Sequence, residues 1–315
     1  MFRTSNRWLW HGIFIVILGF SFLGVYQSSK QINYNWQWER VTPYLLDTSP
    51  LEIRASGDGT VVVNDNGSLA VDLDFDDSPQ QVKIYDERLV EDGDLVFEGD
   101  VIARSEHWSI GPLVFGLWVT LKISVISLFF AVILGLVAGL MRISDNPVTK
   151  NFSFLYVEII RGTPLLVQIF IVYFFLGTIM DLERFTAGVV ALSIFTGAYI
   201  AEIIRSGIQS IPPGQMEAAR SLGMSYPKAM VYVILPQAFK RTLPPMAGQL
   251  ITLIKDSSLV SVISITDLTK AGREVISGSF ATFEIWFVVA GLYLLLTTSL
   301  SWFIQRIEKR LASSD

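Results

Sequence analysis

The sequence contains no cysteine and only two histidines among its 315 residues, His11 and His107. The absence of cysteine excludes disulfide bonds, cysteine metal ligands and a thiol nucleophile. The two histidines lie far apart in the chain, so we interpret both as structural and expect no metal site. A Gly-x-x-x-x-Gly-Lys-Ser/Thr stretch is also missing, so the chain offers no loop that could hold ATP phosphates. Without a nucleophile–base pair either, we expect no catalytic residues and no enzyme activity.

Charged residues are scarce: they make up 17% of the chain, against 51% hydrophobic residues, and the mean hydropathy is +0.48. These values are typical of an integral membrane protein embedded in a lipid bilayer. Residues 29–112 contain 17 Asp and Glu against 6 Lys and Arg, a balance of −11, which leaves +6 for the rest of a chain whose total is −5. No basic stripe that could neutralise phosphates is present, so a nucleic-acid partner is not expected.

Apolar runs predict an all-α transmembrane bundle of about six helices. The predicted spans are residues 8–26, 113–141, 164–180, 185–204, 243–265 and 283–304. No clear cleavage site follows the first run, so we interpret residues 1–28 as a retained N-terminal helix rather than a signal peptide. Residues 113–310 would form a five-helix core, and residues 311–315 a cytoplasmic tail. Six spans place both termini on one side, and the charge bias indicates that this side is the cytoplasm.

Between the first two spans, residues 29–112 predict a small β-rich extracytoplasmic insert. Residues 60–63 and 69–75 alternate in polarity around Asn64-Asp65-Asn66-Gly67, which is typical of a hairpin. Residues 82–85, 95–97 and 101–103 predict further short strands. Asp72, Asp74 and Asp76 alternate along one extended face about 7 Å apart, which favours a solvated charged face over a calcium loop.

A polar stretch at residues 211–236 interrupts the apolar half of the chain. Pro212 and Pro213 suit the start of a helix, and Gly223 can take the left-handed conformation that ends one. After Ser225, an N-cap, a second short helix is predicted to break or bend at Pro236. Residues 205–242 contain 5 Lys and Arg against 1 acidic residue. This bias places the stretch on the cytoplasmic side.

Four separated motifs carry a resemblance to a known family. Glu217-Ala218-Ala219, followed by Gly223 and then Val233-Ile234-Leu235-Pro236, resembles the EAA signature of membrane subunits of ATP-binding-cassette (ABC) importers, with Val233 in place of the usual Ile. The sequences at residues 161–168, 197–202 and 255–259 are similar to the polar amino-acid permease branch. The resemblance covers roughly residues 111–310, and the smallest family members lack the insert.

The resemblance implies a type-I ABC importer permease in a bacterial inner membrane. It implies dimerisation with a second copy or a similar permease, an extracytoplasmic amino-acid-binding protein, and a cytoplasmic ABC ATPase dimer that binds ATP and Mg. No cofactor is expected in this chain. The residues that should contact the ATPase in this reading are Glu217, Ala218, Ala219, Arg220, Gly223, Leu235 and Pro236.

Polar residues in or near the later spans are candidates for a substrate path, because charges at depth are costly unless they face protein or water. Gln249, Thr252 and Asp256 share one helical face. The candidate residues are Gln168, Gln249, Thr252, Lys255, Asp256 and Ser257. An equally good interpretation is that Lys255 and Asp256 pair and hold a helix break. The hydroxyls of Thr120, Ser124 and Ser127 share another face and could line a path or bond their own backbone.

Two other classes of function remain open on the residues alone. A passive channel or ion-coupled carrier is disfavoured because deep charges are few and no inverted repeat is visible. A membrane-bound enzyme would need a reactive constellation that we do not find. The sequence leaves open which amino acid is carried, whether the dimer has one kind of chain or two, and what the insert does.

Overall fold

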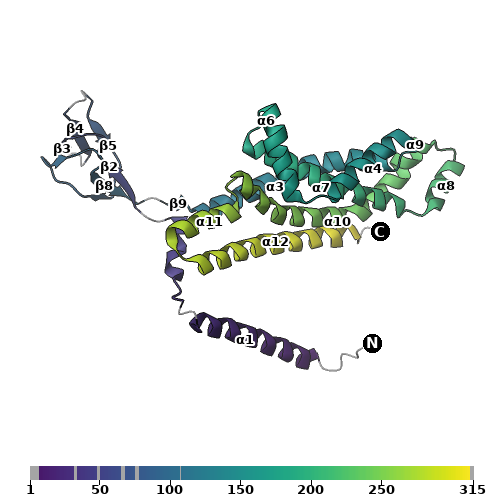
Figure 1. The fold of residues 1–315 in the computed structure, drawn as a ribbon, viewed down its shortest axis with the longest axis horizontal. Coiled ribbons are helices and arrows are strands. Elements are labelled where there is room, and N and C mark those ends of the chain that lie inside the picture. Colours follow the sequence, from purple (N-terminus) through teal and green to yellow (C-terminus); the bar gives the residue numbers. More distant parts are fainter. Residues whose placement is uncertain are drawn as a thin grey trace.

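The computed structural model describes residues 7–31, 34–47, 50–64, 68–74, 78–106 and 108–312. An elongated helical bundle carries the β-rich insert at one end and the short helices α8 (Pro213–Ser221) and α9 (Tyr226–Ala229) at the other (Figure 1). Helix α1 (Arg7–Gln31) stands apart from the bundle. His107 and the last three residues, for which predictions were made from the sequence, lie outside the described residues.

Five helical segments are long and apolar enough to cross a membrane: Trp10–Lys30, Pro112–Arg142, Arg184–Gln209, Tyr226–Ile263 and Thr282–Arg306. A sixth span is obtained only if a bent pair is counted, α4 (Pro147–Arg161) and Leu165–Met180, which meet at 106°. The second arm contains α5 (Leu165–Phe170), a π-helical turn (Ile171–Leu176) and α6 (Gly177–Met180). The predicted span at residues 164–180 thus corresponds to the second arm of this bent pair, Leu165–Met180.

The core of the bundle is the contact between α3 (Pro112–Arg142) and α7 (Arg184–Gln209). Two glycines of α3 permit it: a Cβ at Gly135 would lie 2.5 Å from Ile200 Cγ2, and one at Gly139 would lie 2.9 Å from the Ala201 carbonyl oxygen. Close contact through small residues is how helices pack where lipid removes the hydrophobic driving force. The four-residue spacing of these glycines places both on the face of α3 that meets α7.

The hydroxyl face of α3 is buried in the same region. Ser124 donates to the Thr120 carbonyl at 2.7 Å, and Thr120 Oγ1 accepts from the Leu268 amide at 3.1 Å. Ser127 and Ser193 bond across the α3–α7 contact. Only Ser124 bonds the backbone of its own helix, so that interpretation is confirmed for Ser124 alone, whereas Thr120 and Ser127 bond backbone groups of neighbouring segments.

The polar stretch leads into a helix that is longer than predicted. After α9, a π-helical turn (Met230–Ile234) joins directly to α10 (Leu235–Asp256), and a 3₁₀ segment (Ser257–Ile263) completes the run. No break occurs at Pro236, because the helical run continues through it, with the π-helical turn directly before it. Pro244 and Pro245 lie inside α10 rather than at its start. The predicted loop at residues 205–242 is therefore mostly helical.

The last two helices pack beside this run. Helix α11 (Leu268–Ser279) lies against α3 and α12 (Thr282–Ala312). Most of the segment between the last two predicted spans, residues 266–281, is this amphipathic helix. Leu268, Ala271 and Val275 of α11 join Leu113 and Ile285 in one apolar cluster.

The insert is built from short antiparallel strands. A pair, β1 (Leu46–Asp47) and β9 (Ser109–Ile110), joins it to the bundle. One sheet has the order β2 (Leu51–Arg54), β8 (Val101–Ser105), β6 (Glu87–Arg88), and another has the order β5 (Gln80–Val82), β4 (Leu69–Leu73), β3 (Gly59–Val63), β7 (Leu95–Val96). The predicted hairpin is confirmed, with Val61 opposite Val71. Its turn at residues 65–67, together with Phe75 and Asp76, lies outside the described residues.

The segment between α1 and the insert is held against the bundle by a buried carboxylate. It contains a 3₁₀ turn (Trp38–Arg40) and α2 (Thr42–Leu45). Glu284 at the start of α12 is fully buried and accepts bonds from the Tyr34 hydroxyl and the Gln37 amide. Burial and the Glu284 carboxylate raise the pKa of Tyr34. This anchor holds the segment that follows α1 against the start of α12.

Candidate functional site

Helix α8 and the chain after it form an elbow at the end of the bundle, which we define as residues 213–229. Helix α8 ends in a hydrogen-bonded Schellman motif. The Gly223 amide donates to the Arg220 carbonyl at 3.0 Å, and the Met224 amide donates to the Ala219 carbonyl at 3.2 Å. Gly223 has φ +85°, and nothing lies within 4 Å of the position of a Cβ there. The predicted left-handed glycine is confirmed, and it is required by backbone conformation rather than by packing.

The elbow presents a mixed face to its surroundings. Glu217, Ala218 and Arg220 are exposed, whereas Ala219 is only 3% exposed and packs inward. The two alanines therefore do not lie together on one exposed surface, because consecutive residues of an α-helix point in directions about 100° apart. Ala218 is the small residue that faces outward.

The elbow is also tied to the bundle. Met216 packs with Ile211, Ile234 and Met230 in an apolar cluster, and Gln237 donates to Gln215 at 3.3 Å. Leu235 is half-buried and Pro236 exposed at the start of α10. These contacts make α8 a braced element rather than a free loop.

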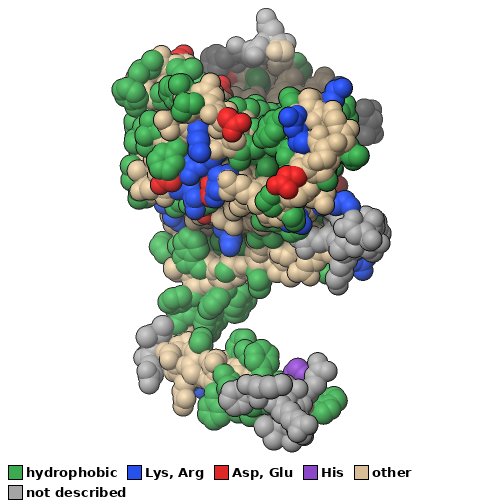
Figure 2. Space-filling view, turned by 90° about the vertical axis from the view of Figure 1, so that its right-hand side faces the viewer, with side chains coloured by type: hydrophobic (Ala, Val, Ile, Leu, Met, Phe, Trp, Pro, Cys, Tyr) green, Lys and Arg blue, Asp and Glu red, His purple; other side chains and the backbone are tan. Residues whose placement is uncertain are grey.

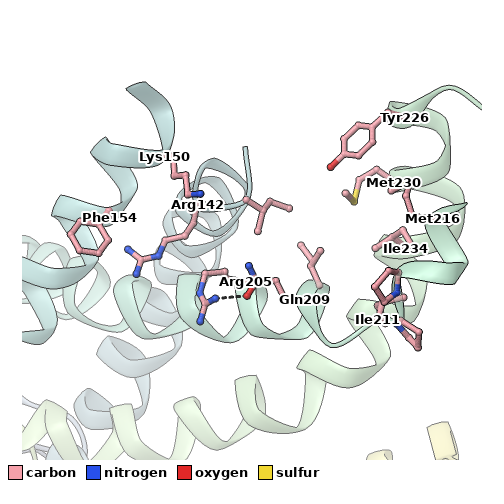
Figure 3. A pocket seen from close by; sticks show the side chains of 14 residues that line it. Arg142, Lys150, Phe154, Arg205, Gln209, Ile211, Met216, Tyr226, Met230 and Ile234 are labelled. Carbon is pink, nitrogen blue, oxygen red and sulfur yellow. Dashed lines mark hydrogen bonds between the residues drawn. The ribbon is translucent and has the colours of Figure 1, made fainter. Parts of the chain in front are cut away.

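A cavity of about 620 Å³ separates the elbow from the corner between α3 and α4 (Figure 3). Arg142, Lys150 and Arg205 line one side of it. Arg205 forms an ion pair with Glu202 and also donates to Gln209. Arg142 lies 3.9 Å from the Glu202 carboxylate. We call this space the corner cavity.

Lys255 of the predicted substrate path lies beside a second cavity, of about 310 Å³, between α10, α11 and α12. This cavity has a mixed lining of one ammonium group, hydroxyls and aromatic rings. Its lining residues are Lys255, Ser258, Thr269, Trp286, Val289, Ala290 and Tyr293. An ammonium group beside hydroxyls and aromatic rings can hold a small molecule that carries a carboxylate.

The other candidates for the substrate path lie near Lys255 in the sequence, and two of them donate hydrogen bonds to backbone carbonyls of the same helical run. Thr252 is exposed and donates to the Gly248 carbonyl at 3.3 Å, and Ser257 is buried and donates to the Ile254 carbonyl at 2.8 Å. Gln249 and Asp256 are half-buried. Among the described residues no ion pair joins Lys255 to Asp256, so the alternative of a paired helix break is not seen.

Gln168 lies at the bend between α4 and α5, away from the lining of the Lys255 cavity. Its amide nitrogen donates to the Ile160 carbonyl at 2.7 Å and to Thr163 Oγ1 at 2.8 Å. Its Oε1 atom is buried without a partner. The side chain thus closes the turn that produces the 106° bend.

Sequence reasoning missed the α11 side of the Lys255 cavity. Buried Asp267 caps α11 by accepting from the Thr269 and Lys270 amides, both at 3.0 Å, and the Tyr293 hydroxyl donates to it at 3.3 Å. Burial raises the pKa of Asp267, although these bonds act against it. An aspartate directly before an amphipathic segment was the available signal, since Asp is a favoured N-cap.

Comparison with known proteins identifies the family. The model of the family described as "Binding-protein-dependent transport system inner membrane component" matches residues 131–313. The glutamine transport system permease protein GlnP of Escherichia coli K12 is 42% identical over 66% of this chain and 96% of that protein. The probable glutamine ABC transporter permease protein GlnM of Bacillus subtilis is 44% identical over 63% and 93%, respectively.

A solved structure is similar to this chain in both sequence and fold. The crystal structure of an amino acid ABC transporter with histidines aligns with a TM-score of 0.60 and 41% identity, covering 63% of this chain and 94% of that one. The family model covers more than half of the chain and includes α8 to α12. The chain therefore belongs to the family of inner membrane components of binding-protein-dependent transport systems.

Proposed function

We propose that this chain is the permease subunit of an ATP-driven importer that carries polar amino acids across a bacterial inner membrane. Its relatives are permeases of glutamine transport systems at 42% to 44% identity. The chain has no phosphate-binding loop of its own, so the energy must come from a separate ATPase dimer that binds ATP and Mg. The braced elbow carries this proposal, because it offers a rigid surface to such a partner.

The proposal includes an orientation. The elbow lies at the opposite end of the bundle from the insert, and α12 runs from the insert end toward the elbow end (Figure 1). Residues 205–242 carry 5 basic residues and 1 acidic residue. On the positive-inside rule the elbow and both termini are cytoplasmic, and the acidic insert is extracytoplasmic.

Coupling is proposed to act through the helix that follows the elbow. An ATPase pressing on Glu217, Ala218 and Arg220 would move α8, whose C-terminal turn is fixed by Gly223. The helical run from Tyr226 reaches Lys255 without a break in helical structure. Those residues span about 44 Å at about 1.5 Å each. The run would therefore transmit movement of the elbow to the second cavity, as a rigid element in a two-state switch.

Within this proposal Lys255 holds the substrate carboxylate in the cavity that it lines with Thr269 and Tyr293. A second permease copy, identical or similar, completes the translocation path, and a binding protein delivers the amino acid from outside. The acidic surface of the insert is the proposed contact for that protein or for the neighbouring permease.

The test is transport by the assembled complex in proteoliposomes that contain ATP inside and a glutamine-loaded binding protein outside. We expect uptake that requires both ATP and the ATPase subunit. Removal of residues 50–104 tests the insert separately, since unchanged docking and uptake would make it a spacer. Uptake that continues without ATP and follows an ion gradient would instead support a secondary carrier and refute the proposal.

A further inference from the structure

The corner cavity has cationic groups whose charge is not fully balanced within the chain. Arg142 is 15% exposed, and it approaches carboxylates only at 3.6 Å (Glu158) and 3.9 Å (Glu202). Lys150 forms no ion pair within the part of the chain that the structure describes. Three cations, Arg142, Lys150 and Arg205, line the cavity, so an anion placed there would be stabilised.

Opposite these cations the wall is apolar. Figure 3 shows Arg142 and Lys150 on one side and Tyr226, Met230 and Ile234 on the other. A site for a free anion needs no apolar wall of this kind. An amphiphile with an anionic head and a hydrocarbon body matches both walls.

A second, apolar groove adjoins the corner cavity. Its volume is about 270 Å³, it is almost entirely apolar, and it shares Ile208 with the corner cavity. Leu136 and Phe239 line it and are 45% and 59% exposed, so the groove opens on the surface of the bundle. Leu136 precedes Arg142 by six residues, which places it about 9 Å further along α3 toward the middle of the membrane. The head-to-tail order matches a lipid that enters from one leaflet.

The position of Arg142 relative to the membrane also fits a lipid-binding site. Helix α3 has 31 residues and so measures about 46 Å, more than the roughly 30 Å of a hydrocarbon core. Arg142 at its end therefore lies at the level of lipid headgroups. Figure 2, which faces the end of the bundle that carries the elbow, shows Lys and Arg side chains gathered there.

We propose that the corner cavity and the adjoining apolar groove bind one anionic phospholipid. Its phosphate lies on Arg142 and Lys150, and one acyl chain lies along Ile208 and Leu136. The lipid fills the space between the elbow and the α3–α4 corner and braces the elbow. Phosphatidylglycerol is the lipid class used for the test.

The experiment measures phosphatidylglycerol bound to the transporter, this full chain together with its ATPase subunits, by native mass spectrometry. We expect Lys150→Gln to weaken binding about fivefold, which corresponds to the roughly 1 kcal/mol that one Lys contributes near an anionic membrane surface. The matched control is Lys228→Gln, an exposed cation at the same end of the bundle that does not line the cavity. We expect no change in that control.

A second pair of variants tests the groove without touching a charge. Leu136→Trp fills the groove and should reduce phosphatidylglycerol binding, whereas Val137→Trp, 55% exposed and outside the groove, should not. Equal binding of phosphatidylcholine, or full displacement by inorganic phosphate, would overturn the proposal in favour of a general lipid surface or a free anion site. Loss of the lipid from the isolated chain when the ATPase docks would assign the cations to a protein partner and also overturn it.

Discussion

Gly223 provides the sharpest test of the elbow, because its contribution is purely conformational. Its φ of +85° is unfavourable for other residues, and no atom lies within 4 Å of the place that a Cβ would occupy. Gly223→Ala should therefore cost about 1 to 2 kcal/mol, the penalty of a left-handed L-residue, with no clash added. Gly223→Pro should cost about 3 kcal/mol or more, because it also removes the N–H that bonds Arg220 and demands negative φ.

Because α8 has only nine residues, it is not stable alone, and losing its C-terminal cap should unravel the turn that carries Ala219 and Arg220. We expect normal membrane insertion of all variants and binding-protein-stimulated ATP hydrolysis and uptake in the order wild type, then Gly223→Ala, then Gly223→Pro. The control is Gly214→Ala in the same helix, where a Cβ meets nothing and φ is not positive. Normal uptake by Gly223→Pro, or equal loss in Gly214→Ala, would refute the reasoning.

Three further predictions concern the elbow, the α11 cap and the second cavity. Ala218→Trp should leave thermal stability within about 0.5 kcal/mol but abolish ATPase co-purification, whereas Ala219→Trp should destabilise the chain by about 1 to 3 kcal/mol through overpacking. The reverse pattern would show that Ala219 is the docking residue. Burial raises the pKa of Asp267, so the folded state favours the protonated carboxyl group more than the unfolded state does. Asp267 therefore stabilises the fold fully below its unfolded pKa of about 3.9, and this stabilisation is lost as the pH rises through the folded pKa. Asp267→Asn, which keeps an N-cap, should flatten the fall of melting temperature with rising pH above about pH 4, and an unchanged pH profile would contradict this. Lys255→Gln should raise the KM for the transported amino acid about tenfold or more. The control is Lys122→Gln, which lies near Phe185 outside the cavity and should leave the KM unchanged. Equal KM values in the two variants would remove Lys255 from the substrate path.

The sequence predicted the features that depend on neighbouring residues. Hydropathy located the spans, because a run of about 20 apolar residues is enough to cross a bilayer. Alternation located the β3–β4 hairpin. Gly223 was identified from its position after a short helical segment, since helix ends commonly use a left-handed glycine.

The predictions from sequence that differ from the structure concern how segments meet. The break predicted at Pro236 did not account for a π-helical turn that carries the chain into α10. Gln168 was predicted as a path residue because it is polar in an apolar run, and the structure shows that its side chain closes the bend between α4 and α5. Whether a polar side chain serves a turn or a cavity depends on which backbone groups are left unpaired nearby, and these are defined only in three dimensions.

The sequence by itself determined that this chain is a membrane bundle with an acidic insert and a polar elbow, because composition, hydropathy and helix-end signals act over a few residues. Only the tertiary structure decided that Ala219 faces inward while Ala218 faces outward. It also placed Lys255 beside Thr269 and Tyr293, and Arg142 beside Lys150, in two separate cavities. Those groupings join residues from different helices, and they follow from helix packing that no local pattern encodes.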